Sequence, residues 1–211
     1  MKTILCYGDS NTWGYIPGTA ERYGRNIRWP KVMQQHLGAG YEVIEEALNG
    51  RTTVHEDFLE EGRNGITYLT PCLISHAPID LVILKLGVND LKHRFSVPAS
   101  DIADGVRKLS WKILKSDSGP NHQPPKLLIV TPPPMGKLSQ FADMFEGGPE
   151  KSRQFSRHYQ AVADELGCAY LDAGAHVVSS DVDGIHWEAD QHVKLGGIMA
   201  EKVKQLCESE D

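Results

Sequence analysis

The chain has 211 residues, of which 40% are hydrophobic and 24% charged. This length fits one globular domain, expected over residues 1–211, and the composition excludes the disordered, collagen-like and coiled-coil classes. Lys and Arg total 22 against 28 for Asp and Glu, and because this net charge of −6 offers no basic excess, we expect no nucleic acid and no membrane as a partner.

Short apolar runs that end at Gly, Pro, Asn or Asp predict buried strands, and apolar residues at helical spacing predict helices between them. In chain order these patterns predict a strand at 4–7, a helix at 29–37, strands at 43–44 and 81–86, a helix at 102–113, a strand at 127–130, a helix at 155–166, a strand at 169–171 and a helix at 195–206. Strands that alternate with helices predict an α/β fold, in which helices cover both faces of a parallel sheet. Segments 117–125 and 132–149 are rich in Pro, Gly and Ser and predict long loops, and the acidic tail 208–211 is expected to fray.

The cysteines are widely separated and form no C-x-x-C pair, which is typical of small buried side chains and not of disulfides or a zinc site. They are Cys6, Cys72, Cys168 and Cys207. No apolar stretch approaches the roughly 18 residues of a membrane span, and the first strand leaves no room for a signal peptide. We therefore expect a cytoplasmic protein. We also expect neither a metal ion nor a cofactor.

Polar residues follow the first two predicted strands, at the edge of the sheet where the carboxyl ends of parallel strands converge. Gly8-Asp9-Ser10-Asn11 follows the first strand, where Ser10 would present its hydroxyl and its backbone N–H. Taken alone, this pattern favours a helix N-cap. Asn49-Gly50 follows the second strand and, taken alone, favours a turn.

Similar patterns follow the third predicted strand and precede the last helix. Asn89, within Gly87-Val88-Asn89-Asp90, either aims its amide at the same edge or caps the next helix. Asp183 and His186 lie three residues apart, and the intervening Gly184 indicates a turn. A turn brings side chains at this spacing to about 5–6 Å, so Asp183 and His186 could share a hydrogen bond.

Together these residues supply the groups that a serine esterase requires. Ser10 is a weak nucleophile that needs an adjacent base, His186, held in the right tautomer by Asp183. Attack on an ester carbonyl creates an oxyanion, which the backbone N–H groups of Ser10 and Gly50 and the side-chain amide of Asn89 would hold. The combination predicts acyl transfer.

The four blocks resemble those of the SGNH, or GDSL-type, hydrolase family, whose four named residues match Ser10, Gly50, Asn89 and His186 in order. The resemblance spans nearly the whole chain. It implies a flavodoxin-like, three-layer α/β fold, hydrolysis of short-chain esters without a metal, acyl transfer to alcohols, and assembly into a homo-oligomer. Further motifs are similar to those of the bacterial arylesterase and acyltransferase subgroup: Trp13-Gly14, Arg28-Trp29, Arg51-Thr52-Thr53, Asn64-Gly65, Tyr68-Leu69, Asp80-Leu81-Val82-Ile83 and Phe145-Glu146-Gly147-Gly148.

The expected substrate is a small-molecule ester. Asp9, Trp13 and Ile185 are assigned to substrate binding, although Trp13 fits a core position equally well. The apolar residues of 132–149 indicate either a lid over the site or a subunit contact. Asn11 follows the nucleophile where many members of the family have Leu, which resembles the carbohydrate deacetylases of the same family.

Two interpretations from other classes stay open. Asp9, Asn89, Asp90, Asp183 and His186 would also suit a divalent ion in a metal-dependent phosphoesterase. A non-catalytic ligand-binding module is the other interpretation, since a fold does not fix a function.

Overall fold

Residues 1–208 are described by the computed structural model, in which five parallel strands form one sheet in the order β2-β1-β3-β4-β5. The strands are β1 (Lys2–Gly8), β2 (Tyr41–Ala47), β3 (Leu81–Lys85), β4 (Lys126–Thr131) and β5 (Ala169–Asp172). Each strand overlaps a predicted apolar run, so the predicted parallel sheet is confirmed. β2 is longer than its two-residue run because Glu42, Glu45 and Glu46 interrupt the apolar pattern of this edge strand.

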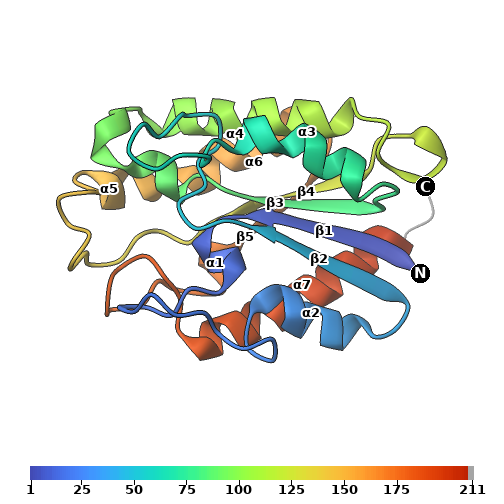
Figure 1. Cartoon of the computed structure of the whole chain (residues 1–211), viewed down its shortest axis with the longest axis horizontal. Coiled ribbons are helices and arrows are strands. Elements are labelled where there is room, and N and C mark those ends of the chain that lie inside the picture. The colour runs from blue at the N-terminus through green and yellow to red at the C-terminus, as the bar shows by residue number, and fades with distance from the viewer. Residues whose placement is uncertain (209–211) are drawn as a thin grey trace.

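Helices cover both faces of the sheet, with α3, α4 and α6 on one side and α2 and α7 on the other (Figure 1). The α-helices are α1 (Ser10–Trp13), α2 (Trp29–Leu37), α3 (Gly65–Ser75), α4 (Ala99–Leu114), α5 (Gly148–Ser152), α6 (Phe155–Leu166) and α7 (Ala189–Glu208). The predicted α/β architecture with three layers is therefore confirmed. Helices α2 and α6 have the predicted bounds, whereas α4 and α7 begin earlier than predicted.

Three further segments compare differently with the sequence-based prediction. The sequence does not predict α3, because Pro71 lies inside the helix and interrupts its pattern. Segment 132–149 is irregular, as predicted, until α5 begins at Gly148. Of the expected acidic tail, Glu208 ends α7 and residues 209–211 lie outside the described part of the chain.

The core consists of two apolar layers, one on each face of the sheet. Side chains alternate along β1, so that Ile4 and Cys6 pack into the layer under α2 and α7, while Leu5 and Tyr7 pack into the layer under α3, α4 and α6. The four cysteines are free thiols. None of the helices in residues 1–208 has the length and apolar character that crossing a bilayer requires.

The 3₁₀ turns complete the connections: η1 (Val88–Leu91), η2 (His93–Phe95), η3 (Pro120–His122) and η4 (Ala173–Ala175). The turn η1 and helix α1 both follow a strand at its carboxyl end, because η1 comes after β3 and α1 after β1. β1 and β3 are neighbours in the sheet. The fold therefore places the residues of Gly8–Asn11 next to those of Gly87–Asp90.

Candidate active site

Ser10 and His186 share a hydrogen bond although 176 positions separate them, with 3.0 Å between the serine Oγ and the histidine Nε2. Ser10 begins α1 directly after β1, and Asp9 caps that helix by accepting a hydrogen bond from the Asn11 N–H. His186 lies in the loop before α7. Both residues are nearly buried, at 7% and 6% exposure. The structure therefore brings the predicted nucleophile and base together.

Asp183 is fully buried and holds His186 through a 2.8 Å hydrogen bond between its Oδ2 and the histidine Nδ1. Its Oδ1 accepts the backbone N–H groups of Ile185 and His186, each at 2.9 Å. Burial alone would raise the pKa of Asp183, but the hydrogen bonds from His186 and from these backbone groups lower it to about 2. An ionised Asp183 fixes the proton on Nδ1, which leaves Nε2 free to accept a proton from Ser10.

Two backbone contacts fix the loop that carries Asp183 and His186. The side-chain amide of Asn11 donates to the carbonyl oxygen of Ile185 at 3.1 Å, so the residue after the nucleophile ties α1 to this loop. Gly136 donates its N–H to the carbonyl oxygen of Gly184 at 2.8 Å. Segment 132–149 therefore supports the His186 loop through a second contact, independent of α1.

The predicted oxyanion donors come from the loops after β2 and β3. Gly50 has a φ of +78°, in the left-handed region that favours glycine. The Asn89 amide donates one hydrogen to the carbonyl oxygen of Arg51 at 3.1 Å, which joins the two loops and leaves its second N–H available. Ser10, Gly50 and Asn89 all line one cavity. The three predicted oxyanion donors therefore border the same space.

Tertiary contacts explain the glycine at position 87 and the aspartate at position 90, on either side of Asn89. Gly87 has a φ of +122°, and a Cβ at this position would lie 1.9 Å from the Tyr159 hydroxyl. The buried Asp90 carboxylate accepts hydrogen bonds from the N–H and hydroxyl of Thr53, the latter at 2.6 Å. It also contacts Nδ1 of His55 at 2.7 Å, and this hydrogen bond raises the pKa of His55. Asp90 therefore anchors the loop that carries Gly50.

The cavity beside Ser10 and His186 has a volume of about 190 Å³. Three of its apolar residues, Phe141, Met144 and Phe145, belong to segment 132–149, which therefore forms a wall of the cavity. Its polar residues come from other segments of the chain. The complete lining is Ser10, Tyr15, Asn49, Gly50, Glu60, Asn89, Lys92, Phe141, Met144, Phe145, Ile185 and His186.

Of the three residues assigned to substrate binding from the sequence, Ile185 lines this cavity, whereas Asp9 and Trp13 do not. Asp9 is 1% exposed and pairs with the buried Lys85 ammonium at 3.0 Å, so its carboxylate serves the interior. Trp13 instead lies under the guanidinium of Arg22, which is 4.9 Å from the centre of its ring. The assignment of Asp9 is corrected accordingly, whereas that of Trp13 stays a prediction.

The sequence does not indicate two groups that the structure places at the cavity. The ring of Tyr15 stacks on His186, with 4.1 Å between the ring centres and 24° between the planes. Lys92 is 3% exposed and its ammonium contacts Glu60 at 2.7 Å, so the polar wall is an ion pair. Tyr15 lies five residues after the nucleophile and Lys92 three after Asn89, and this proximity was the only available signal.

The ligand set considered for a phosphoesterase is not assembled. Asp9 is paired with Lys85, and Asp90 with Thr53 and His55. Within residues 1–208, the group of metal-ligating His, Cys, Asp and Glu side chains that does come together is a different one, described below. The geometry therefore favours the serine-based interpretation.

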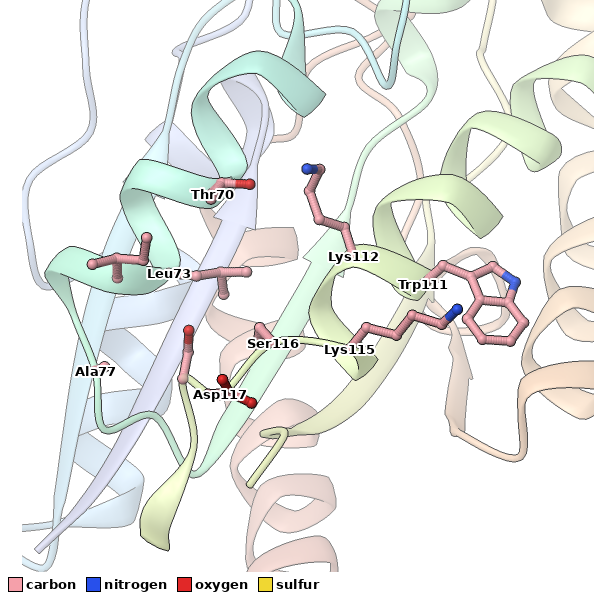
Figure 2. Close-up of a pocket in the computed structure, with 10 residues that line it drawn as sticks. Thr70, Leu73, Ala77, Trp111, Lys112, Lys115, Ser116 and Asp117 are labelled. Carbon is pink, nitrogen blue, oxygen red and sulfur yellow. The ribbon is translucent and has the colours of Figure 1, made fainter. Parts of the chain in front are cut away.

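A larger cavity of about 630 Å³ lies between α3 and α4, with Leu73 and Trp111 on its two sides (Figure 2). Lys112 of α4 and Lys115, which directly follows this helix, border it, and the lining includes Thr70, Ser116 and Ser118. No histidine is among its lining residues, so none of these hydroxyls has the imidazole base that activates Ser10. The smaller cavity is therefore the candidate active site.

Comparisons with known proteins agree with this geometry. Residues 6–194 match the GDSL-like Lipase/Acylhydrolase family. Est24, a carbohydrate acetylesterase from Sinorhizobium meliloti, and an aryl esterase from M. smegmatis are each 40% identical, with 98% of this chain and 100% of theirs covered and a TM-score of 0.94. A lipase/acylhydrolase from Enterococcus faecalis, at 18% identity, 97% and 96% coverage and a TM-score of 0.69, shares the fold. A search of curated proteins gave no significant match.

Proposed function

The chain belongs to the GDSL-like lipase/acylhydrolase family, and from this membership we propose that it hydrolyses short-chain, acetyl-type carboxylic esters through Ser10, His186 and Asp183. The observation that carries the proposal is the continuous set of hydrogen bonds from the Ser10 hydroxyl through His186 to Asp183. The carbohydrate acetylesterase and the aryl esterase that resemble this chain support the esterase class.

In the first half of the reaction, the Ser10 oxygen attacks the ester carbonyl carbon and its proton moves to Nε2 of His186. The carbonyl π bond breaks, and its electrons form an oxyanion that the N–H groups of Ser10, Gly50 and Asn89 stabilise. When the tetrahedral intermediate collapses, the ester C–O bond breaks and His186 returns the proton to the leaving alcohol. Asp183 stabilises the imidazolium between these two transfers. The product is an acyl group bonded to Ser10.

In the second half, a water molecule gives its proton to His186 and attacks the acyl carbon. Collapse breaks the bond to Ser10, which regains its proton from His186, and the carboxylic acid leaves. An alcohol that replaces this water would receive the acyl group as a new ester. We include this acyl transfer in the proposal, because the chemistry of the two acceptors is the same.

The size of the cavity supports a short acyl group. At about 190 Å³ it is below the 300–1,000 Å³ that is typical of drug-sized ligand sites.

The polar residues of the cavity favour an acetylated carbohydrate as the second candidate substrate. Asn49 has a buried side-chain oxygen without a hydrogen-bond partner in residues 1–208, and Glu60 offers a carboxylate. Both are acceptors for sugar hydroxyl groups.

We also propose that the chain forms a homo-oligomer. Phe58 and Leu59 are 91% and 78% exposed, and they precede Glu60 of the cavity wall. Adjacent apolar side chains at such exposure are typical of a contact surface. A subunit that covers them would narrow the cavity mouth, and light scattering tests this because a monodisperse monomer would contradict it.

We further propose a cytoplasmic location. The free thiols of all four cysteines support a reducing compartment, since oxidising compartments favour disulfides. Cell fractionation of a tagged chain tests this proposal, and recovery of the protein outside the cytoplasm would contradict it.

The serine mechanism is tested by organophosphate labelling of the wild type, followed by peptide mass spectrometry and assays with p-nitrophenyl acetate. We expect one label on Ser10, parallel loss of turnover, and full turnover after treatment with a chelator. Ser10→Ala should be unlabelled and inactive, whereas the exposed Ser100→Ala should behave as the wild type. Inactivation by chelator with an unlabelled Ser10 would instead show a metal-dependent enzyme.

A further inference from the structure

Glu46, Cys72 and His76 form a cluster of metal-ligating side chains outside the candidate active site. One ligand atom from each, a carboxylate oxygen, the thiol sulfur and an imidazole nitrogen, lies within 4.8 Å of the other two. Nε2 of His76 is 2.7 Å from Oε1 of Glu46. None of the three residues lines the cavity beside Ser10. We propose that this cluster is a binding site for Zn²⁺.

The backbone explains why these three side chains meet. Cys72 lies in the last turn of α3 and His76 caps the helix, where the backbone N–H of His76 donates to the carbonyl oxygen of Cys72 at 3.2 Å. This four-residue spacing at the helix end brings the two side chains together. Glu46 is near the carboxyl end of β2, the edge strand of the sheet. His76 follows the last residue of α3, and the partial negative charge at a helix carboxyl end favours a cation there.

The ligand types and their exposure fit a zinc ion. Zn²⁺ binds thiolate, imidazole and carboxylate together, usually with tetrahedral geometry. Cys72 is buried, whereas the side chains of Glu46 and His76 are 21% and 28% exposed. The Cys72 thiol therefore supplies the buried ligand, and water can occupy the fourth ligand position from the solvent side.

Small side-chain rotations are enough to admit the ion. Ordinary zinc bond lengths and tetrahedral angles place two ligand atoms about 3.3–3.6 Å apart. Glu46 and His76 must therefore separate by somewhat under about 1 Å from their present 2.7 Å. The Cys72 sulfur, which lies within 4.8 Å of both, must approach by at most about 1.5 Å. The ion replaces the thiol proton of Cys72, which is released to water, and it replaces the hydrogen bond between His76 and Glu46.

The position of the cluster assigns the ion a structural role. It would connect edge strand β2 to the end of α3, two elements that belong to different layers of the fold. A ligand that binds the folded chain alone stabilises it against unfolding. Zinc should therefore raise the melting temperature and leave ester hydrolysis unchanged, which separates this proposal from the one for Ser10.

The test is a calorimetric titration of Zn²⁺ into the full chain after chelator treatment, with Co²⁺ absorption as the spectroscopic readout. We expect one saturable site, a near-ultraviolet thiolate-to-cobalt band, and a higher melting temperature with zinc. In Cys72→Ala and His76→Ala the zinc affinity should fall by more than the 10–100-fold loss that is typical when a residue hydrogen-bonded to a metal ligand is removed. The cobalt band should vanish in Cys72→Ala. Cys168→Ala and His158→Ala, which change a thiol and an imidazole elsewhere, should bind as the wild type.

Circular dichroism establishes that each variant is folded, and Glu46→Gln serves as a second probe because this side chain is partly exposed. Weaker zinc binding by folded Glu46→Gln supports the site. Zinc binding that persists unchanged in Cys72→Ala would overturn the proposal, as would absence of saturable binding by the wild type. Either result would leave the esterase mechanism of Ser10 unaffected.

Discussion

The ring of Tyr15 stacks on the imidazole of His186, with 4.1 Å between the ring centres. The stack restricts the tilt of the imidazole, while the hydrogen bond to Asp183 restricts its rotation. We expect Tyr15→Ala to lower kcat by about 10-fold or more, because small displacements of a catalytic group are costly. Tyr15→Phe should retain the wild-type kcat, since it preserves the ring. Steady-state kinetics with p-nitrophenyl acetate measures both variants, and equal activity of Tyr15→Ala and wild type would contradict the role.

The depressed pKa of Asp183 predicts how stability depends on pH. Its value of about 2 in the folded chain lies below the ordinary 3.8, so the ionised carboxylate stabilises the fold above about pH 4 and loses this effect as the pH falls towards 2. The shift corresponds to about 2 kcal/mol. Asp183→Asn imitates the protonated acid, so its destabilisation relative to wild type should be about 1–2 kcal/mol smaller at pH 2.5 than at pH 7.

Urea unfolding at the two pH values measures this difference. Asp104→Asn is the matched control, because the Asp104 side chain is 63% exposed. A destabilisation by Asp183→Asn that is equal at both pH values would show that the carboxylate contributes no charge-dependent stability. Turnover of Asp183→Asn should also fall by about 10²–10⁴-fold, because the imidazole loses its fixed tautomer.

Gly87→Ala should destabilise the fold by about 2–4 kcal/mol, since the new Cβ adds a clash to an unfavourable φ. The Cβ would lie 1.9 Å from the Tyr159 hydroxyl. Gly38→Ala is the matched control, because its φ is also positive, at +76°, but no atom lies within 4 Å of its Cβ. It should cost about 1 kcal/mol. Thermal unfolding compares them, and equal losses would show that the Tyr159 contact is unimportant.

Lys85→Met should destabilise the chain by about 3–5 kcal/mol, because it leaves the Asp9 carboxylate buried without its ion pair. Both side chains are 1% exposed. Adding Asp9→Asn removes this charge, so the double variant should regain part of the stability. Lys204→Met, which removes a partly exposed partner of Glu201, should change stability by less than about 1 kcal/mol. A double variant less stable than Lys85→Met in urea unfolding would contradict this account.

Phe141 should limit the length of the acyl chain. Its ring lies 6.1 Å from that of His186 and lines the cavity. Phe141→Ala enlarges the cavity, so the ratio of kcat/KM for p-nitrophenyl butyrate to that for the acetate should rise by about 10-fold, the order of one or two methylenes in an apolar pocket. Val193→Ala, at an exposed position of α7, should leave the ratio unchanged. An unchanged ratio in Phe141→Ala would exclude it as a determinant.

Local sequence patterns predicted the parts of this fold that depend on local physics. Apolar runs located all five strands, and Gly167 located the end of α6. The helix α3 escaped prediction because its apolar face is interrupted by Pro71. Likewise, three polar glutamates hid most of β2, an edge strand whose side chains are only partly buried.

In the candidate site too, residues in local motifs could be predicted and residues that depend on tertiary contacts could not. Ser10, Asn89 and His186 follow recognisable motifs because turns at strand ends have strict requirements for residue type. Asp9 was misassigned because its sequence position beside Ser10 says nothing about Lys85, the distant residue with which it pairs. The stack of Tyr15 and the meeting of Glu46 with Cys72 equally depend on tertiary contacts, so no periodicity of the sequence could indicate them.

The hydrogen bond between Ser10 and His186 joins the first strand connection to the segment before the last helix, across 176 positions of the chain. During refolding, neither end of the chain alone can form this pair. If Ser10 and His186 carry the reaction as proposed, recovery of ester hydrolysis during refolding should require closure of the chain from its first strand connection to the segment before α7.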